Sequence, residues 1–122
     1  MDKKTLTPTI AVDFDGTLCK EAWPDIGEAN WPLINFLIKW RNQGKKVILW
    51  TCRENDMLRN AVNWCAVRGL FFDAINCNLK ERIDAYGNDS RKIGADYYID
   101  DSSTLIIEHS KVITPPRKEM WL

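Results

Sequence analysis

The feature that most constrains the fold is an alternation of short apolar segments with segments of helical periodicity. Four apolar runs have the length and composition of buried strands, at residues 9–13, 46–50, 71–77 and 95–100. Short strands that alternate with amphipathic helices are joined by right-handed crossovers, and these build a parallel sheet. The sequence therefore predicts an α/β fold, a three-layer Rossmann-like sheet of about five parallel strands with helices on both faces.

The helices between these runs can be placed from caps and periodicity. Asn30 is typical of a helix cap, Leu33 and Leu37 recur at helical spacing after it, and Gly44 suits the helix end. A second amphipathic helix is predicted over 56–68. The stretch 79–92 indicates one short helix and a turn, and 103–113 either a short helix or a fifth strand.

Length and composition narrow the class of protein. A chain of 122 residues has room for one domain, which we expect to have a core over about 9–114 and a tail over 115–122. The 17 basic and 17 acidic residues balance, so the net charge does not indicate binding to nucleic acid. No apolar stretch is long enough to span a membrane, residues 1–9 lack the apolar region of a signal peptide, and the cysteines form no CxxC pair. We expect a cytoplasmic protein with reduced thiols.

Polar residues follow three of the predicted strands directly. Asp13 and Asp15 come at the end of the first strand in "TIAVDFDGTL", Thr51 ends the second, and Asp100 and Asp101 end the fourth. In parallel sheets, ligands bind beyond the carboxyl ends of the strands, so these side chains are expected to converge on one edge.

Several carboxylates at one edge would repel one another unless a cation lay among them. All the ligands on offer are oxygens, which favours Mg²⁺ over zinc. A bound Mg²⁺ is a platform for a phosphate oxygen. Thr51 could add its hydroxyl and neighbouring backbone N–H groups, and Lys92 a point charge, to the same phosphate.

This order of motifs resembles the phosphatase branch of the haloacid dehalogenase superfamily over residues 9–104. "DFDGTL" is similar to its first motif, "VILWT" to its second, Lys92 to its third and "YYIDDS" to its fourth. The resemblance implies a Mg²⁺-dependent phosphatase in which Asp13 is the nucleophile and Asp15 the general acid and base. It also implies that Asp13, Asp15 and Asp101 hold the metal, and that Thr51 and Lys92 bind phosphate.

Some assignments stay open between two residues or two roles. In the fourth motif Asp101 is expected to be the direct metal ligand, with Asp100 behind it or as the alternative ligand. Lys80 is the rival of Lys92. Arg53 either reaches the distal part of the substrate or pairs with the neighbouring Glu54.

The connections are too short for the cap domain that most superfamily members carry, so the resemblance is to a capless member with an open site. The loop 19–29 is the one built-in lid candidate, and its Trp23 is a candidate substrate contact. Either a large phosphorylated substrate or a second subunit would then exclude water. The apolar residues 120–122 favour a homo-oligomer. Trp31, Trp40, Trp50 and Trp64 are expected in the core, Trp121 either disordered or against a partner subunit, and Cys52 as a small buried side chain.

Two rival functions belong to other classes. A phospho-accepting receiver domain also combines carboxylates, a threonine and a lysine on a parallel sheet, but its acid pair lies on the first strand and its lysine comes last. Here the adjacent acid pair, Asp100 and Asp101, comes after Lys92. The other rival is an inactive relative that binds without turnover, and the intact set of motif residues argues against it.

Overall fold

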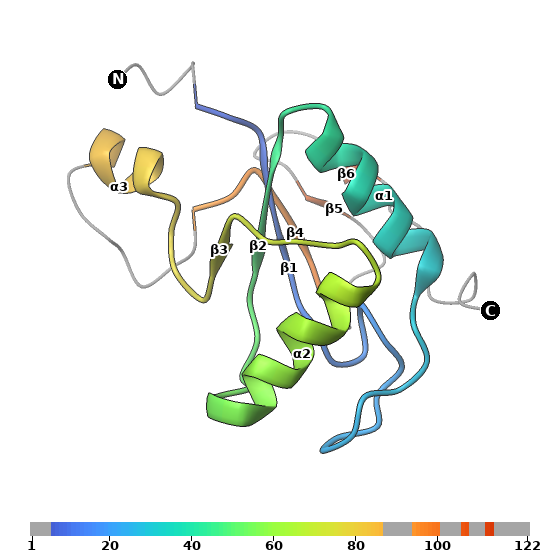
Figure 1. The fold of residues 1–122 in the computed structure, drawn as a ribbon. Helices are drawn as coiled ribbons and strands as arrows, with labels where there is room; N and C mark the ends of the chain where they lie inside the picture. Colours follow the sequence, from blue (N-terminus) through green and yellow to red (C-terminus); the bar gives the residue numbers. More distant parts are fainter. Residues whose placement is uncertain (1–5, 87–93, 101–105, 108–111, 114–122) are drawn as a thin grey trace.

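The computed structural model describes residues 6–86, 94–100, 106–107 and 112–113. Within them, four strands form one parallel sheet in the order β3-β2-β1-β4, and helices follow the strands (Figure 1). The elements are β1 (Thr9–Val12), α1 (Trp31–Asn42), β2 (Lys46–Leu49), α2 (Asn55–Val67), β3 (Ala74–Ile75), α3 (Lys80–Tyr86), β4 (Tyr97–Ile99), β5 (Ile106–Ile107) and β6 (Val112–Ile113). The predicted α/β class and parallel sheet are confirmed.

The expected fifth parallel strand is not found among the described residues. Instead β5 and β6 pair with each other antiparallel, Ile106 opposite Ile113. The connection between β4 and β5 explains this difference. A parallel neighbour needs a crossover of about a dozen residues or more, and 100–105 is much shorter.

Local signals placed α1 correctly. The Asn30 side chain accepts a hydrogen bond from Leu33 N–H at 3.3 Å, as expected for a cap. Its amide nitrogen also donates to the Thr17 carbonyl at 2.9 Å, which fixes the loop after β1 to the start of the helix. Beyond the other end, Gly44 has a φ of +81°, a conformation that a side chain would oppose.

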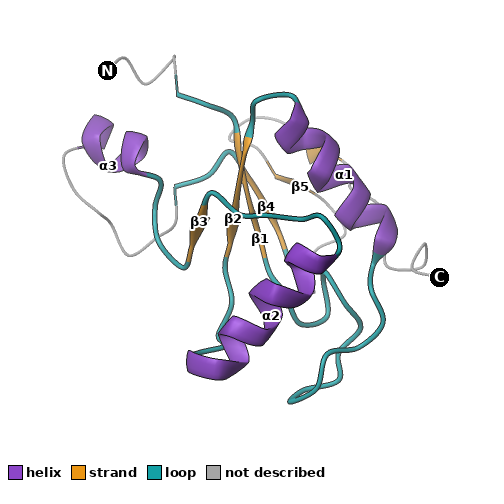
Figure 2. Ribbon diagram, in the orientation of Figure 1, coloured by secondary structure: helices purple, strands orange, loops and turns teal. Residues whose placement is uncertain are grey.

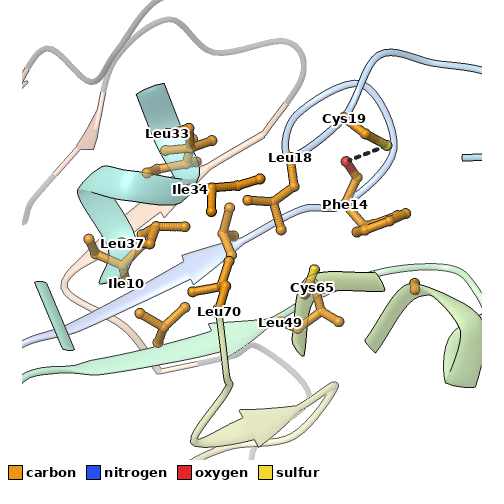
Figure 3. Packing of buried hydrophobic residues seen from close by; sticks show 14 residues of the cluster. Ile10, Phe14, Leu18, Cys19, Leu33, Ile34, Leu37, Leu49, Cys65 and Leu70 are labelled. Atoms are coloured by element: carbon orange, nitrogen blue, oxygen red, sulfur yellow. Dashed lines mark hydrogen bonds between the residues drawn. The ribbon is translucent and has the colours of Figure 1, made fainter. Parts of the chain in front are cut away.

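One face of the sheet packs against α1 and α2. Buried apolar side chains of the strands and of both helices form one cluster on this face. Phe14 and Leu18 lie at its end nearest the loop that follows β1 (Figure 3). Strand residues alternate between the faces, so Ile10 and Val12 belong to this cluster while Ala11 lies on the other side. The core therefore holds the ends of β1 and β2 in place.

The other face carries a smaller cluster in which Leu79 and Ala95 pack against Ala11 and Ile48. The helix that follows, α3, is anchored near the start of β1, because Arg82 donates to the Thr7 carbonyl at 3.0 Å and to Asp96 at 2.9 Å (Figure 2). Two helices thus cover one face, and the third lies toward the amino end of the sheet.

The connections between the strands leave no room for a cap domain in the described stretch 6–86. A loop and α1 fill the connection from β1 to β2, and α2 fills that from β2 to β3. Among the helices of the described residues, none is long and apolar enough to cross a membrane.

Candidate functional site

Three of the expected residues meet at the carboxyl edge of the sheet. The backbone N–H of Asp13 donates to the Ile99 carbonyl at 2.9 Å, so Asp13 lies beside the end of β4, which Asp100 follows. On its other side, Trp50 N–H donates to the Val12 carbonyl at 2.8 Å, which brings the end of β2 and Thr51 alongside. The expected convergence of Asp13, Thr51 and Asp100 on one edge is therefore confirmed for the described residues.

The turn after β1 sets the direction of the Asp13 side chain. One carboxylate oxygen, Oδ1, accepts the N–H of Phe14 at 2.8 Å. Gly16 has a φ of +77°, and the N–H groups of Thr17 and Leu18 both donate to the Phe14 carbonyl. The chain thus turns off the strand immediately, which leaves the half-buried Asp13 at the edge.

Thr51 is 8% exposed, and two of its groups are engaged. Its N–H donates to the Asn76 side-chain oxygen at 2.8 Å, so this N–H is not available to a phosphate. Its hydroxyl oxygen accepts the N–H of Arg53 at 3.1 Å, which leaves the hydroxyl hydrogen to donate to an anion. Asn76 was missed from the sequence; the available signal was an asparagine directly after a strand, which here has a φ of +54°.

Asp15 forms a two-pronged ion pair with Arg53. Arg53 Nε donates to Asp15 Oδ2 at 2.8 Å, and Nη2 donates to Oδ1 at 2.7 Å. This hydrogen bonding raises the pKa of Arg53, and the Arg53 side chain is 1% exposed against 20% for Asp15. Arg53 thus pairs with Asp15 and not with its neighbour Glu54, and in this conformation the guanidinium is closed off from a substrate.

The same guanidinium binds the loop 19–29. It donates to the Pro24 carbonyl at 3.3 Å and to the Asp25 carbonyl at 3.0 Å. The ring of Phe14 lies 5.1 Å from the guanidinium carbon and the ring of Trp23 4.8 Å, within cation–π range. Trp23 is 55% exposed, so the loop presents an aromatic surface to solvent directly above a buried arginine.

Trp50 and Cys52, which were expected in the core, lie at the surface. Trp50 is 47% exposed and packs edge-on against Tyr98, with ring centroids 6.3 Å apart. Cys52 is also exposed. Both lie at the open end of β2, where the sheet ends and nothing among the described residues covers them as a core would. Trp31 is likewise exposed, whereas Trp40 and Trp64 pack against the core as expected.

Two of the expected ligands lie outside the described residues, namely Lys92 and Asp101. The rival Lys80 is described and lies at the other end of the sheet. It begins α3, whose next residue, Glu81, accepts a hydrogen bond from the Thr7 hydroxyl before β1. This position sets Lys80 apart from Asp13.

The donor set fits Mg²⁺ in kind, since Asp13 and Asp100 supply hard oxygen ligands from neighbouring strands. The described residues hold no group of three or more histidine, cysteine or acidic side chains that could bind a metal ion. The Asp15 carboxylate is paired with Arg53 in this conformation, and its expected part in holding the metal stays a prediction.

The fold is similar to the solved structure of a conserved protein from Bacteroides thetaiotaomicron. The TM-score is 0.70 and the sequences are 39% identical, over 80% of this chain and 78% of that chain. No protein-family model matches the chain, and no curated protein matches it. This similarity bears on the fold and family of the chain and not on its chemistry.

Proposed function

We propose that this chain, which belongs to the same family as the conserved Bacteroides thetaiotaomicron protein, is a Mg²⁺-dependent phosphomonoester phosphatase that forms an aspartyl-phosphate on Asp13. The observation that carries the proposal is the meeting of Asp13, Thr51 and Asp100 at the ends of three neighbouring parallel strands. The proposal includes the capless, three-layer architecture of the haloacid dehalogenase superfamily. The four parallel strands and the short connections support it.

In the first half-reaction, a carboxylate oxygen of Asp13 attacks phosphorus and the bond from phosphorus to the leaving oxygen breaks. Asp15 gives its proton to the departing alkoxide. The Thr51 hydroxyl hydrogen is placed to donate to a phosphate oxygen, because its oxygen already accepts Arg53 N–H. Lys92 adds positive charge to the same phosphate.

In the second half-reaction, water attacks phosphorus and Asp15 takes the proton that the water loses. The bond from phosphorus to Asp13 then breaks and inorganic phosphate leaves, so Asp13 returns as a carboxylate. Asp13 with Asp101 or Asp100 would hold Mg²⁺, which when bound would neutralise charge on the phosphate oxygens.

The test is turnover of a panel of phosphomonoesters by purified protein, with Mg²⁺ and with a chelator. We expect Mg²⁺-dependent phosphate release that Asp13→Asn abolishes, because an amide is not a nucleophile here. Asp56→Asn is the matched control, since Asp56 is exposed on α2 and pairs only with Arg59 among the described residues. Retained activity in a folded Asp13→Asn protein would exclude the covalent mechanism.

One observation favours a second candidate, a domain that accepts or binds phosphate without turnover. Both oxygens of Asp15 accept hydrogen bonds from Arg53, so the carboxylate that should protonate the leaving oxygen and activate water is paired with a cation in this conformation. Such a domain would take up one phosphate per chain from a reactive donor and release it slowly. Continuous phosphate release from a phosphomonoester decides for the phosphatase.

A further inference from the structure

Arg53 connects two parts of the site that are far apart in sequence. Its guanidinium spans the Asp15 carboxylate on one side and the backbone carbonyls of Pro24 and Asp25 on the other. The rings of Phe14 and Trp23 lie against it, and its side chain is 1% exposed. A buried cation with this many partners is held by all of them, so a change at one partner affects the others.

This arrangement has a consequence for Asp15. A carboxyl group that donates or accepts a proton has to face the reacting oxygen, and an oxygen that accepts one N–H keeps a second lone pair for that proton. In the described conformation each Asp15 oxygen accepts from the guanidinium, at 2.7 Å and 2.8 Å. The position of Arg53 therefore sets the direction in which the Asp15 carboxylate faces.

The loop in turn holds Arg53 in this position. The two ends of the loop 19–29 are joined by backbone hydrogen bonds. Lys20 N–H donates to the Glu28 carbonyl at 2.8 Å, and next to the loop Asn30 N–H donates to the Leu18 carbonyl at 2.9 Å. The middle of this loop contacts Arg53 through the carbonyls of Pro24 and Asp25 and through the ring of Trp23. If the loop moves, the guanidinium of Arg53 has to move with it or lose its contacts with the loop.

We propose that Arg53 is a positioning residue that ties the loop 19–29 to Asp15, so that the position of the loop sets the orientation of the Asp15 carboxylate for proton transfer. The exposed ring of Trp23 is the surface through which a bound substrate moves the loop. The inference rests on the proposed phosphatase function for its kinetic part, and on the hydrogen bonds alone for the coupling of loop and carboxylate.

The coupling is tested first without any substrate, by hydrogen–deuterium exchange of wild type, Asp15→Asn and Arg53→Lys. Both variants should exchange the amides of residues 19–30 faster, while those of β1 and β2 keep their protection. Arg82→Lys is the matched control, because Arg82 is also buried and bonded to an aspartate, at the other end of the sheet. It should leave the loop unchanged. Unchanged exchange of the loop in both site variants would overturn the proposal.

The kinetic part is tested by a double-mutant cycle on an alkyl phosphate. Arg53→Lys should lower kcat about tenfold or more in the wild-type background and less than about threefold in the Asp15→Asn background, because Arg53 acts through Asp15. The loss in the first background should be smaller on an aryl phosphate, whose leaving group needs less proton transfer. Losses that multiply independently in the double variant would show that Arg53 contacts the substrate instead. If wild type releases no phosphate at all, the phosphatase proposal fails and the exchange experiment still decides the coupling.

Discussion

Removing Asp15 from its pair with Arg53 should lower the free energy of unfolding more than removing Arg53 does. Asp15→Ala leaves a guanidinium whose side chain is 1% exposed, with only two backbone carbonyls to balance its charge. Breaking a buried ion pair in this way lowers the free energy of unfolding by about 3–5 kcal/mol.

Arg53→Met leaves a partner, Asp15, that water can reach. The Asp15 side chain is 20% exposed, and Pro24 and Asp25 are exposed as well, so water can replace the lost donors. The methionine also keeps most of the apolar contact with Phe14 and Trp23. We therefore expect a smaller loss, about 1–2 kcal/mol.

Urea unfolding followed by circular dichroism measures both values, by linear extrapolation to water. Asp56→Ala is the control for removing an aspartate as such, because its pair with Arg59 is exposed and worth less than about 1 kcal/mol. If Arg53→Met lowers stability as much as Asp15→Ala or more, the argument from unequal burial is refuted.

Three further predictions concern the helix cap, the thiols and the acid. Asn30→Ala should lower the free energy of unfolding by about 1–2 kcal/mol in urea unfolding, because it removes both the cap bond and the bond to the preceding loop; a loss near zero would contradict the cap's role. In native protein at pH 8 a thiol reagent should modify exposed Cys52 and Cys77 but not Cys65, because burial raises the pKa of Cys65 to about 12. Between the ordinary thiol pKa of 9.0 and that value, unfolded chains lose this proton and folded ones keep it, so this thiol's contribution to stability falls as pH rises. Asp15→Asn should slow hydrolysis of alkyl phosphates more than that of p-nitrophenyl phosphate, and equal losses in kcat would count against the acid role.

The sequence could predict what depends on periodicity and on local signals. The alternation of apolar runs and amphipathic segments was enough to predict a parallel sheet, because few other arrangements bury both kinds of element. The rule that ligands bind at the carboxyl ends of parallel strands then predicts that Asp13, Thr51 and Asp100 lie together. The cap at Asn30 needed only a residue type and its spacing.

The remaining features depend on contacts between distant segments, which residue types and spacing do not specify. Arg53 and Asp15 are 38 positions apart, and no pattern in either segment indicates that they pair. The bond from Thr51 to Asn76 likewise joins the ends of two strands. The fifth parallel strand was predicted wrongly for a simpler reason. The connection 100–105 is too short for a parallel crossover.

In the proposed mechanism the phosphoryl group passes through Asp13, so trapping the aspartyl-phosphate is the decisive measurement. Excess enzyme is mixed with a phosphomonoester and Mg²⁺, quenched in acid within one turnover, and reduced with borohydride. Reduction converts an aspartyl-phosphate to homoserine, which peptide mass spectrometry locates. We expect homoserine at position 13, in wild type and in greater amount in Asp15→Asn, whose second half-reaction is slow. Rapid phosphate release by the wild type with Asp13 unmodified in both proteins would contradict it.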